Sequence, residues 1–336
     1  MRLSELGEFG LIARLTQDLS LRPDVIAGAG DDASVLDAGG NTQIIATCDA
    51  QVEGKHFIRG TATPREIGHK VLAVNLSDIA AMGAEPAWVL VSLVLPPDIP
   101  VEELDGIYAG MRALAGSTQV SIVGGNIAST SGPLTIDITV LGLVERGHAV
   151  LRSGARAGDR LIVTGALGGA AAGVLAFTAD TVPPGVPSEV LEGVRQRMVA
   201  PTARVAAGHA LGAGGMVHAM IDISDGLAAD LGHLCDASGV GAILDANAVP
   251  VDTGARTLAL AAARDPLELA LAGGEDYELL FAVAPAEVER ALEVVRSAGD
   301  VATVIGSITE ERNLSIRMPD GGTVPLERRG WDHLRG

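Results

Sequence analysis

Six aspartates stand at the ends or in the middle of apolar segments, and they constrain this chain more than any other feature. They are Asp31, Asp32, Asp49, Asp78, Asp222 and Asp225. A carboxylate that loses its water on burial costs several kcal/mol unless an opposite charge compensates it. Few Lys or Arg residues stand beside these acids, so we expect divalent cations among them. Ligands that are all oxygen atoms favour Mg2+ over Zn2+.

The length and the charge of the chain limit its classes of partner. Its 336 residues predict two domains. Lys and Arg number 24 against 42 Asp and Glu, which gives a formal net charge of -18. This balance argues against a nucleic acid and against an anionic membrane surface, because both require a basic face. An acidic protein can still bind a polyphosphate when metal ions lie between the two sets of negative charge.

The cysteines and the apolar runs predict a cytoplasmic location. Cys48 and Cys235 form no CxxC motif and no cluster with histidines, which is typical of reduced thiols. The first residues carry acids and no long apolar region, so they do not indicate a signal peptide. The longest strongly apolar stretch, 87–97, is too short to cross a bilayer as a helix.

The hydrophobic pattern predicts an α/β or α+β fold in two parts. In the first part we expect helices at 6–19, 64–82 and 101–115. Strands are expected there at 43–48, 88–95, 120–123 and 135–144. The segment 146–159 breaks this pattern and is the expected linker, which places the domains at 1–148 and 149–336.

The second part has a similar mixture of elements. A strand at 160–164 leads into the glycine-rich loop 165–169 and an alanine-rich helix that ends near 179. Further helices are expected near 189–212 and 226–238. Further strands are expected near 241–245, 278–284 and 301–307. No repeat with a fixed period relates the two parts.

Asp78 admits a structural explanation as well as a functional one. On a helix it would share a face with Asn75, three residues earlier, beside an apolar strip. Lys70 lies two turns earlier on the same side and could be its counter-ion. A buried pair of Lys70 and Asp78 is therefore the structural alternative to a metal ligand.

The segment 221–227 places Asp222 and Asp225 three residues apart around Ser224. Asp225 precedes a glycine at an expected helix start, where an aspartate commonly accepts hydrogen bonds from the first N–H groups. Such capping explains one of the two acids but not both. The acids of 273–278, which follow two glycines, are a similar and weaker signal.

Two other glycine-rich segments raise the question of phosphate binding. The segment 28–33 has GxGxxA spacing, but its two adjacent acids would repel a pyrophosphate and no long helix follows. The segment 164–173 predicts a strand, a loop and a helix whose first N–H groups could hold phosphate oxygens. It lacks the Gly-Lys-Ser/Thr ending of a Walker A loop, and close packing of a Gly/Ala helix would explain it as well.

Nine sequence pieces, spread from residue 7 to residue 333, occur in an order typical of one family. The most specific are Asn75-Leu-Ser-Asp-Ile-Ala-Ala-Met-Gly-Ala84 and Val52-Glu-Gly-Lys-His-Phe57. The others are Gly7-Glu-Phe9, Gly30-Asp-Asp-Ala33, Leu151-Arg-Ser-Gly-Ala155, Val163-Thr-Gly-Ala-Leu-Gly168, Ile221-Asp-Ile-Ser-Asp-Gly-Leu227, Gly273-Gly-Glu-Asp-Tyr-Glu-Leu279 and Gly330-Trp-Asp-His333. Together they resemble the motifs of thiamine-monophosphate kinases, within the aminoimidazole-ribonucleotide-synthetase-like superfamily.

The resemblance implies roles for residues at the matching positions. It implies several Mg2+ ions on oxygen ligands, at Asp32, Thr47, Cys48, Asp49, Asp78, Asn126, Asp222 and Asp225. It implies ATP contacts at Gly125, Asn126, Arg152 and Ser224. It implies substrate contacts at His56, Glu275 and Trp331. Asp49, Asp78 and Arg152 would then act directly on the transferred phosphate.

The resemblance also implies a fold and an assembly. In this family an N-terminal α/β domain pairs its sheet with that of a second subunit to form a barrel. The expected protein is therefore a homodimer. Nucleotide is expected between this domain and the larger C-terminal domain, which closes over nucleotide and substrate.

Two positions depart from the family pattern. Asn126 stands where an aspartate is usual, so a carboxylate ligand has become a neutral amide whose oxygen can still bind Mg2+. Cys48 stands where an oxygen-bearing residue is common, and its thiol is a poor Mg2+ ligand, although its backbone carbonyl could serve.

The reaction implied is transfer of the ATP γ-phosphoryl group to thiamine monophosphate. The acceptor phosphate is already anionic, so it needs alignment and charge neutralisation rather than a general base. Two alternatives remain. One is a superfamily enzyme acting on another small molecule, and the other is a nucleotide-binding homologue that has lost turnover, which the changes at Asn126 and Cys48 motivate.

Overall fold

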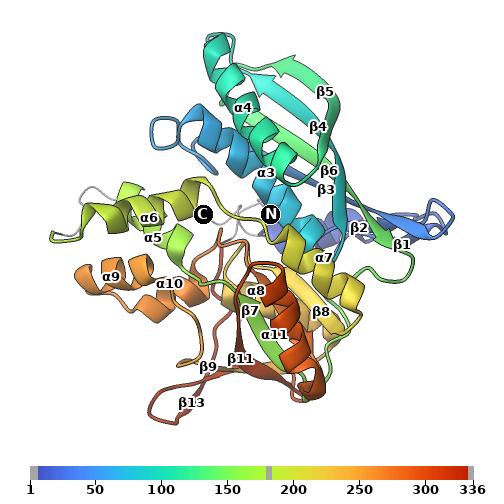
Figure 1. The fold of residues 1–336 in the computed structure, drawn as a ribbon, viewed down its shortest axis with the longest axis vertical. Coiled ribbons are helices and arrows are strands. Elements are labelled where there is room, and N and C mark those ends of the chain that lie inside the picture. Colours follow the sequence, from blue (N-terminus) through green and yellow to red (C-terminus); the bar gives the residue numbers. More distant parts are fainter. Residues whose placement is uncertain (1–6, 179–183, 332–336) are drawn as a thin grey trace.

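The computed structural model describes residues 7–178 and 184–331, and within them the chain forms two sheets with helices packed on them (Figure 1). The first half of the chain contributes a six-stranded sheet in the described residues, and the second half contributes a seven-stranded sheet. The expected mixed α and β class is confirmed. The end of the last matching piece, His333, lies outside the described residues.

The six-stranded sheet is mostly antiparallel. In the described residues its order is β1-β2-β3-β6-β4-β5, and only β4 and β5 pair in parallel, with the connection between them made by α4. The strands are β1 Val25–Ala27, β2 Ser34–Leu36, β3 Thr42–Val52, β4 Glu85–Leu95, β5 Ser121–Ser129 and β6 Thr135–Glu145. Helix α2 (Glu8–Thr16) is shorter at both ends than the helix expected at 6–19.

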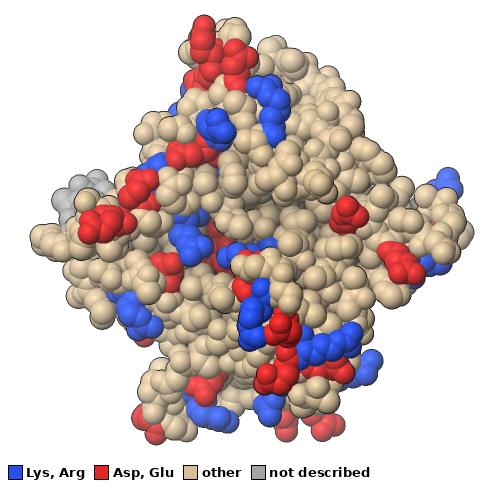
Figure 2. All heavy atoms as spheres, viewed as in Figure 1, with Lys and Arg blue, Asp and Glu red and all other residues tan. Residues whose placement is uncertain are grey.

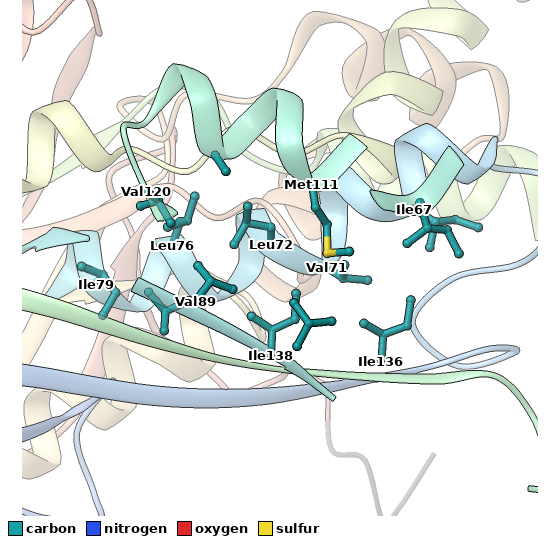
Figure 3. Close-up of a cluster of buried hydrophobic side chains, with 14 of the residues drawn as sticks. Ile67, Val71, Leu72, Leu76, Ile79, Val89, Met111, Val120, Ile136 and Ile138 are labelled. Carbon is teal, nitrogen blue, oxygen red and sulfur yellow. The ribbon is translucent and has the colours of Figure 1, made fainter. Parts of the chain in front are cut away.

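Helices α3 (Pro64–Ala81) and α4 (Val101–Ser117) cover one face of this sheet. Helix α3 begins where Thr63 and Glu66 form a capping box and Pro64 occupies the first turn. Most of α3 is buried, because it packs against α4, the sheet and the second half of the chain. Figure 3 shows its apolar side chains between α4 and the strands.

The seven-stranded sheet has the order β13-β12-β9-β11-β7-β10-β8 in the described residues. Its strands are β7 Arg160–Thr164, β8 Val217–Asp222, β9 Gly241–Asp245, β10 Leu279–Val283, β11 Ala302–Thr309, β12 Leu314–Arg317 and β13 Thr323–Pro325. The helices of this half are α5 Gly169–Thr178, α6 Ser188–Val199, α7 Val205–Gly214, α8 Leu227–Ser238, α9 Thr253–Ala261, α10 Pro266–Ala272 and α11 Val288–Ser297.

The second half differs from the sequence expectations in three ways. The helix expected near 189–212 is two helices, α6 and α7, because Pro201 follows Ala200 and disfavours a helical backbone there. Strand β8 was not expected, because its short apolar run merges with the 221–227 motif. Helices α9, α10 and α11 and the strands β12 and β13 were also missed.

Helix α3 runs through the middle of the molecule, between the two sheets (Figure 1). It packs on α7 at unusually short range, since a Cβ atom added at Gly208 would lie 2.2 Å from the Ala80 carbonyl oxygen. A Cβ at Gly212 would lie 2.6 Å from the Gly83 carbonyl oxygen. Glycines at these two positions therefore let α3 approach the second half closely.

The other face of the six-stranded sheet carries no covering helix in the described residues. Val89 and Val91 of β4 are buried against the helices, so Trp88 and Leu90 point to the uncovered side, where they are 40% and 43% exposed. Strand β5 is the edge strand and nearly all of its residues are exposed. Among the described residues, no helix is long and apolar enough to cross a membrane.

Candidate functional site

Three buried or partly buried aspartates meet where the two halves join. Carboxylate oxygens of Asp32, Asp78 and Asp222 all lie within 4.8 Å of one another. Asp32 precedes β2, Asp78 is in the last turns of α3, and Asp222 is the last residue of β8. Three elements that are far apart in sequence thus bring their acids to one point. We call these three residues the acid cluster.

Each member of the acid cluster has one short contact with the protein. Thr47 Oγ1 donates a hydrogen bond to Asp78 Oδ2 at 2.6 Å. Arg152 Nη2 donates to Asp32 Oδ1 at 2.6 Å, which forms a salt bridge. Asp222 Oδ2 accepts a hydrogen bond from the Ser77 hydroxyl of α3. These contacts orient the carboxylates, but they include only one cation for three acids.

The electrostatics of the acid cluster are unfavourable without a further cation. Burial raises the pKa of Asp222 to about 8, and the charge of Asp32 adds to the shift. Burial also raises the pKa of Asp78 well above its usual value, with further contributions from Asp222, Asp32 and Asp49. The pKa of Asp32 is raised by burial although Arg152 opposes the shift. Each carboxylate therefore resists ionising beside the others.

The acid cluster fits Mg2+. Asp32 Oδ2 is buried and has no hydrogen-bond partner among the described residues. A buried oxygen without a donor is costly unless a cation or water satisfies it. The donor set consists of hard oxygen atoms, which suits Mg2+ and not a soft metal. The metal predicted at Asp32, Asp78 and Asp222 is thus chemically compatible with their arrangement.

Thr47 and Asp49 lie on one face of β3, because they are two residues apart and side chains alternate along a strand. Thr47 reaches Asp78, and the charge of Asp49 raises the pKa of Asp78. The structure therefore brings Asp49 and Thr47 to the acid cluster. These two residues would extend the acid cluster along β3.

Cys48 and Asn126 do not reach the acid cluster within one chain. Cys48 alternates with Thr47, and its Sγ lies 3.5 Å from Asp137 Oδ1 on the uncovered side of the sheet. Asn126 pairs with Ser92, whose neighbours in β4 are buried against the helices, so Asn126 also faces the uncovered side. Gly125 pairs with Val91 and therefore faces the helix side, on the exposed edge strand β5. In the single chain the side chains of Cys48 and Asn126 therefore point away from the acid cluster, and the backbone carbonyl considered as the ligand at Cys48 stays a prediction.

A second group of potential ligands lies beside the first, and sequence reasoning found only one member of it. Atoms of Asp225, Asp230 and His233 also lie within 4.8 Å of one another. Asp230 Oδ2 accepts hydrogen bonds from the N–H groups of Asp225 and Gly226 at 3.1 and 3.0 Å. Helix α8 has Gly226 as its N-cap, so the capping role considered for Asp225 is not observed. An acid in the first turn of the helix was the available signal for Asp230.

The loop 273–278 lies against the 221–227 segment. A Cβ atom at Gly274 would lie 2.4 Å from the Ser224 carbonyl oxygen, so glycine is required for this approach. The next acid, Glu275, pairs with Lys70, whose Nζ lies 2.8 Å from Glu275 Oε1. The pairing of Lys70 with Asp78 that the sequence suggested is therefore wrong.

The other acids of this loop have structural partners. Asp276 Oδ2 accepts the N–H of Gly168 at 2.7 Å, in front of α5, and burial raises the pKa of Asp276 to about 8. The carboxylate of Glu278 pairs with Arg204 and accepts a hydrogen bond from Thr164. The N-terminal end of α5 is thus already occupied by Asp276, which argues against the phosphate site considered for 164–173.

A cavity of about 90 Å³ opens next to Glu275, between the two halves. Its polar lining residues are Lys55, His56, Thr61, Lys70, Thr178 and Glu275, and the rest of its lining is apolar. His56 Nδ1 accepts the N–H of Val52 at 3.0 Å, so a neutral ring carries its proton on Nε2. The lining includes Phe57, Ile58, Ile67, Val174, Met198 and Val199.

Trp331 lies elsewhere, with its backbone N–H 3.2 Å from the Asp225 carbonyl oxygen. Its side chain is 47% exposed and does not line the cavity. Of the three predicted substrate residues, the structure brings His56 and Glu275 together and places Trp331 beside Asp225. Figure 2 shows acidic and basic side chains close together in a recess near the middle of this face of the molecule.

Comparisons with known proteins cover nearly the whole chain. The family model "AIR synthase related protein, N-terminal domain" matches residues 30–144, and the corresponding C-terminal domain model matches residues 156–319. The thiamine-monophosphate kinase of Salmonella typhimurium is 38% identical over 98% of each chain. That of Bacillus subtilis is 34% identical over 98% of this chain and 100% of its own.

Solved structures give the same result. The structure named "AaThiL complexed with AMPPCP and TMP" has a TM-score of 0.84 at 33% identity and covers 99% of both chains. The thiamine-monophosphate kinase of Stenotrophomonas maltophilia has a TM-score of 0.76 at 35% identity, over 94% of this chain and 96% of its own.

Proposed function

The chain belongs to the thiamine-monophosphate kinase family of AIR synthase related proteins, and we propose that it transfers the γ-phosphoryl group of ATP to thiamine monophosphate. The products would be thiamine diphosphate and ADP. The observation that carries this proposal is the acid cluster, in which both halves of the chain contribute carboxylates to one point. A similar structure named for its complex with AMPPCP, an ATP analogue, and TMP supports both substrates.

The acid cluster would hold magnesium ions, with Asp49 and Thr47 beside it. When bound, these ions would neutralise the repulsion between two sets of phosphate oxygens. Asp225 and Asp230, in the second group of potential ligands beside the acid cluster, would provide further oxygen ligands. Several acids that are each costly when ionised alone would then be stabilised together.

The protein groups around the acid cluster would align the phosphates. An oxygen of the substrate phosphate attacks the γ-phosphorus, and the bond to the bridging oxygen of ADP breaks as the new bond forms. No proton acceptor is required, because the attacking oxygen is already ionised. Arg152 is already fixed by Asp32 at 2.6 Å, and it would offset charge on the transferred group. Ser224, at the turn after β8, would contact the nucleotide.

The cavity would receive the ring system of the substrate. Its mostly apolar lining suits two aromatic rings, and its polar groups can fix their orientation. His56 would donate from Nε2, and Glu275 would accept. Trp331 would contribute only if the segment around Asp225 closes over the substrate. We also propose a cytoplasmic location, because both proposed substrates are water-soluble and because Cys48 and Cys235 form no disulfide.

We further propose that the protein is a homodimer that buries the uncovered face of the six-stranded sheet. Trp88 and Leu90 lie on this face, and the edge strand β5 beside it exposes Val123, at 56%. An exposed edge strand with apolar side chains is a site for association. Figure 2 shows few charged side chains over the part of the surface where β4 and β5 lie.

The direct test is an assay of the purified protein with ATP and thiamine monophosphate over a range of Mg2+ concentrations. We expect thiamine diphosphate to form and the rate to fall to background without Mg2+. Aminoimidazole precursors serve as the comparison substrates for another enzyme of the superfamily. If Mg2+-dependent ATP binding occurs and thiamine diphosphate does not form, the protein is a non-catalytic homologue and the proposal is wrong.

A further inference from the structure

The pair of Lys70 and Glu275 joins α3 to the loop before β10 at the wall of the cavity. Lys70 is 3% exposed, and its Nζ lies 2.8 Å from Glu275 Oε1. An ammonium group so deeply buried is stable only beside an opposite charge. Both side chains line the cavity, so this ion pair forms part of its wall rather than a link at the outer surface.

The backbone around Glu275 is fixed on both sides. Glu275 has a φ of 64°, in the left-handed region, which is uncommon for a residue other than glycine. Its N–H donates to the Ser224 carbonyl oxygen at 2.7 Å. Asp276 and Glu278 hold the following backbone through the contacts to Gly168 and Arg204. The freedom that remains at Glu275 is therefore rotation of its side chain.

We propose that Lys70 is a positioning residue for the substrate, because it holds the Glu275 carboxylate inside the cavity in the orientation that contacts the bound rings. The proposal rests on the proposed function, since it requires thiamine monophosphate to occupy this cavity. Glu275 is 28% exposed at its side chain, so without Lys70 it can rotate toward water. Substrate binding would then have to order it again, which weakens affinity.

The test compares the Michaelis constants of Lys70→Met with those of the wild-type protein. We expect the KM for thiamine monophosphate to rise about tenfold or more, and the KM for ATP and kcat to change less than about twofold. Lys70→Arg retains a cation and should recover part of the affinity. A KM for thiamine monophosphate that stays at the wild-type value in Lys70→Met would overturn the proposal.

Arg195 provides the matched control. Its Nη2 lies 2.7 Å from Glu66 Oε1, so it also ties a second-half helix to α3. It does not itself line the cavity, although its Nη1 bonds the backbone carbonyl of Thr61, a lining residue, at 3.1 Å. Arg195→Met should lower the unfolding temperature and leave the KM for thiamine monophosphate unchanged. If Arg195→Met raises this KM as much as Lys70→Met does, the effect is a general loosening of the two halves and the positioning role is wrong.

A double-mutant cycle with Glu275→Gln tests whether Lys70 acts through Glu275. We expect the double variant to have the same KM for thiamine monophosphate as Glu275→Gln alone, whereas multiplied effects would overturn the proposal. Calorimetric binding of thiamine monophosphate separates this result from turnover. A wild-type protein that binds this ligand without phosphorylating it refutes the kinase proposal, and the same cycle in Kd still decides the role of Lys70. A wild-type protein that does not bind it refutes both.

Discussion

Ser77 Oγ donates a hydrogen bond to Asp222 Oδ2 at 2.5 Å, and this contact joins α3 to the end of β8. The next residue of the same helix is Asp78, which belongs to the acid cluster. One turn of α3 thus contributes one member of the acid cluster and holds another member from the opposite half of the chain. The relative position of the two halves and the geometry of the cluster are set by the same helix turn.

Ser77→Ala should therefore weaken Mg2+ binding, although Ser77 itself is not a member of the acid cluster. Asp222 loses a buried donor, so its carboxylate is less well oriented, and the Mg2+ concentration for half-maximal rate should rise several-fold. The free energy of unfolding should fall by about 1–3 kcal/mol, the cost of breaking a buried hydrogen bond. Ser117→Ala is the control, because Ser117 Oγ bonds only a carbonyl near the exposed end of α4. Equal Mg2+ dependence in the two variants would contradict this prediction.

Asp222→Asn should separate function from stability. The amide keeps the shape and can still accept the Ser77 hydrogen bond, but it removes a charge that burial and Asp32 make unfavourable. We expect the metal-free variant to unfold at a higher temperature than the metal-free wild type at pH 8.5. The phosphoryl-transfer rate should fall by about a hundredfold or more, as for loss of a charged ligand. A variant that is both less stable without metal and fully active would refute a metal role for this residue.

The gain in stability on adding Mg2+ should depend on pH. The folded pKa of Asp222 is about 8, above its unfolded value, so the metal-free fold binds extra protons. That stabilising effect of protonation is present below the unfolded pKa of about 4 and is lost as the pH rises through about 8. Protons and Mg2+ compete for the same oxygens. Adding Mg2+ should thus raise the unfolding temperature more at pH 8.5 than at pH 5.5.

Thermal unfolding with EDTA and with Mg2+ at both pH values measures this effect. Asp276 also has a folded pKa of about 8, but it accepts a hydrogen bond from Gly168 and is not in either ligand group. Its contribution is the same with and without metal, so it cancels in the difference. A larger Mg2+ effect at pH 5.5 than at pH 8.5 would contradict the prediction.

The sequence was sufficient for the elements that have strong periodicity or clear ends. Helix α3 was expected at 64–82 and extends over Pro64–Ala81, because Thr63, Pro64 and Glu66 define its start. The acids Asp32, Asp78 and Asp222 were singled out from their apolar surroundings alone, and the structure brings them together. Burial of a carboxylate is visible in sequence because the flanking residues are apolar.

The sequence was not sufficient where tertiary structure determines which residues contact one another. Lys70 lies two turns from Asp78 on α3, but its ammonium group forms its salt bridge with Glu275, because the 273–278 loop lies within reach of it. Asn126 was placed with the ligands by resemblance, and only the register of β5 against β4 shows that it faces the other side. Neither fact follows from spacing along the chain.

The uncovered face of the sheet also predicts how the protein assembles. If two copies bury this face against each other, Leu90→Lys should place a charge in an apolar interface and shift the protein to monomers. Sedimentation velocity at micromolar concentration would report the change in mass. Leu260→Lys is the control, because Leu260 is 63% exposed on α9, away from this sheet. It should leave the mass unchanged.

The same experiment bears on Asn126. In a dimer that pairs the uncovered faces, Asn126 lies in or beside the interface, so its only route to an acid cluster is through the partner protomer. Asn126→Asp would then lower the Mg2+ requirement of the wild-type dimer, and it would have no such effect in the Leu90→Lys background. A lower requirement in both backgrounds would place Asn126 at the cluster of its own chain, against the register of β5. A wild-type protein that sediments as a monomer would exclude the dimer and, with it, any metal role for Asn126.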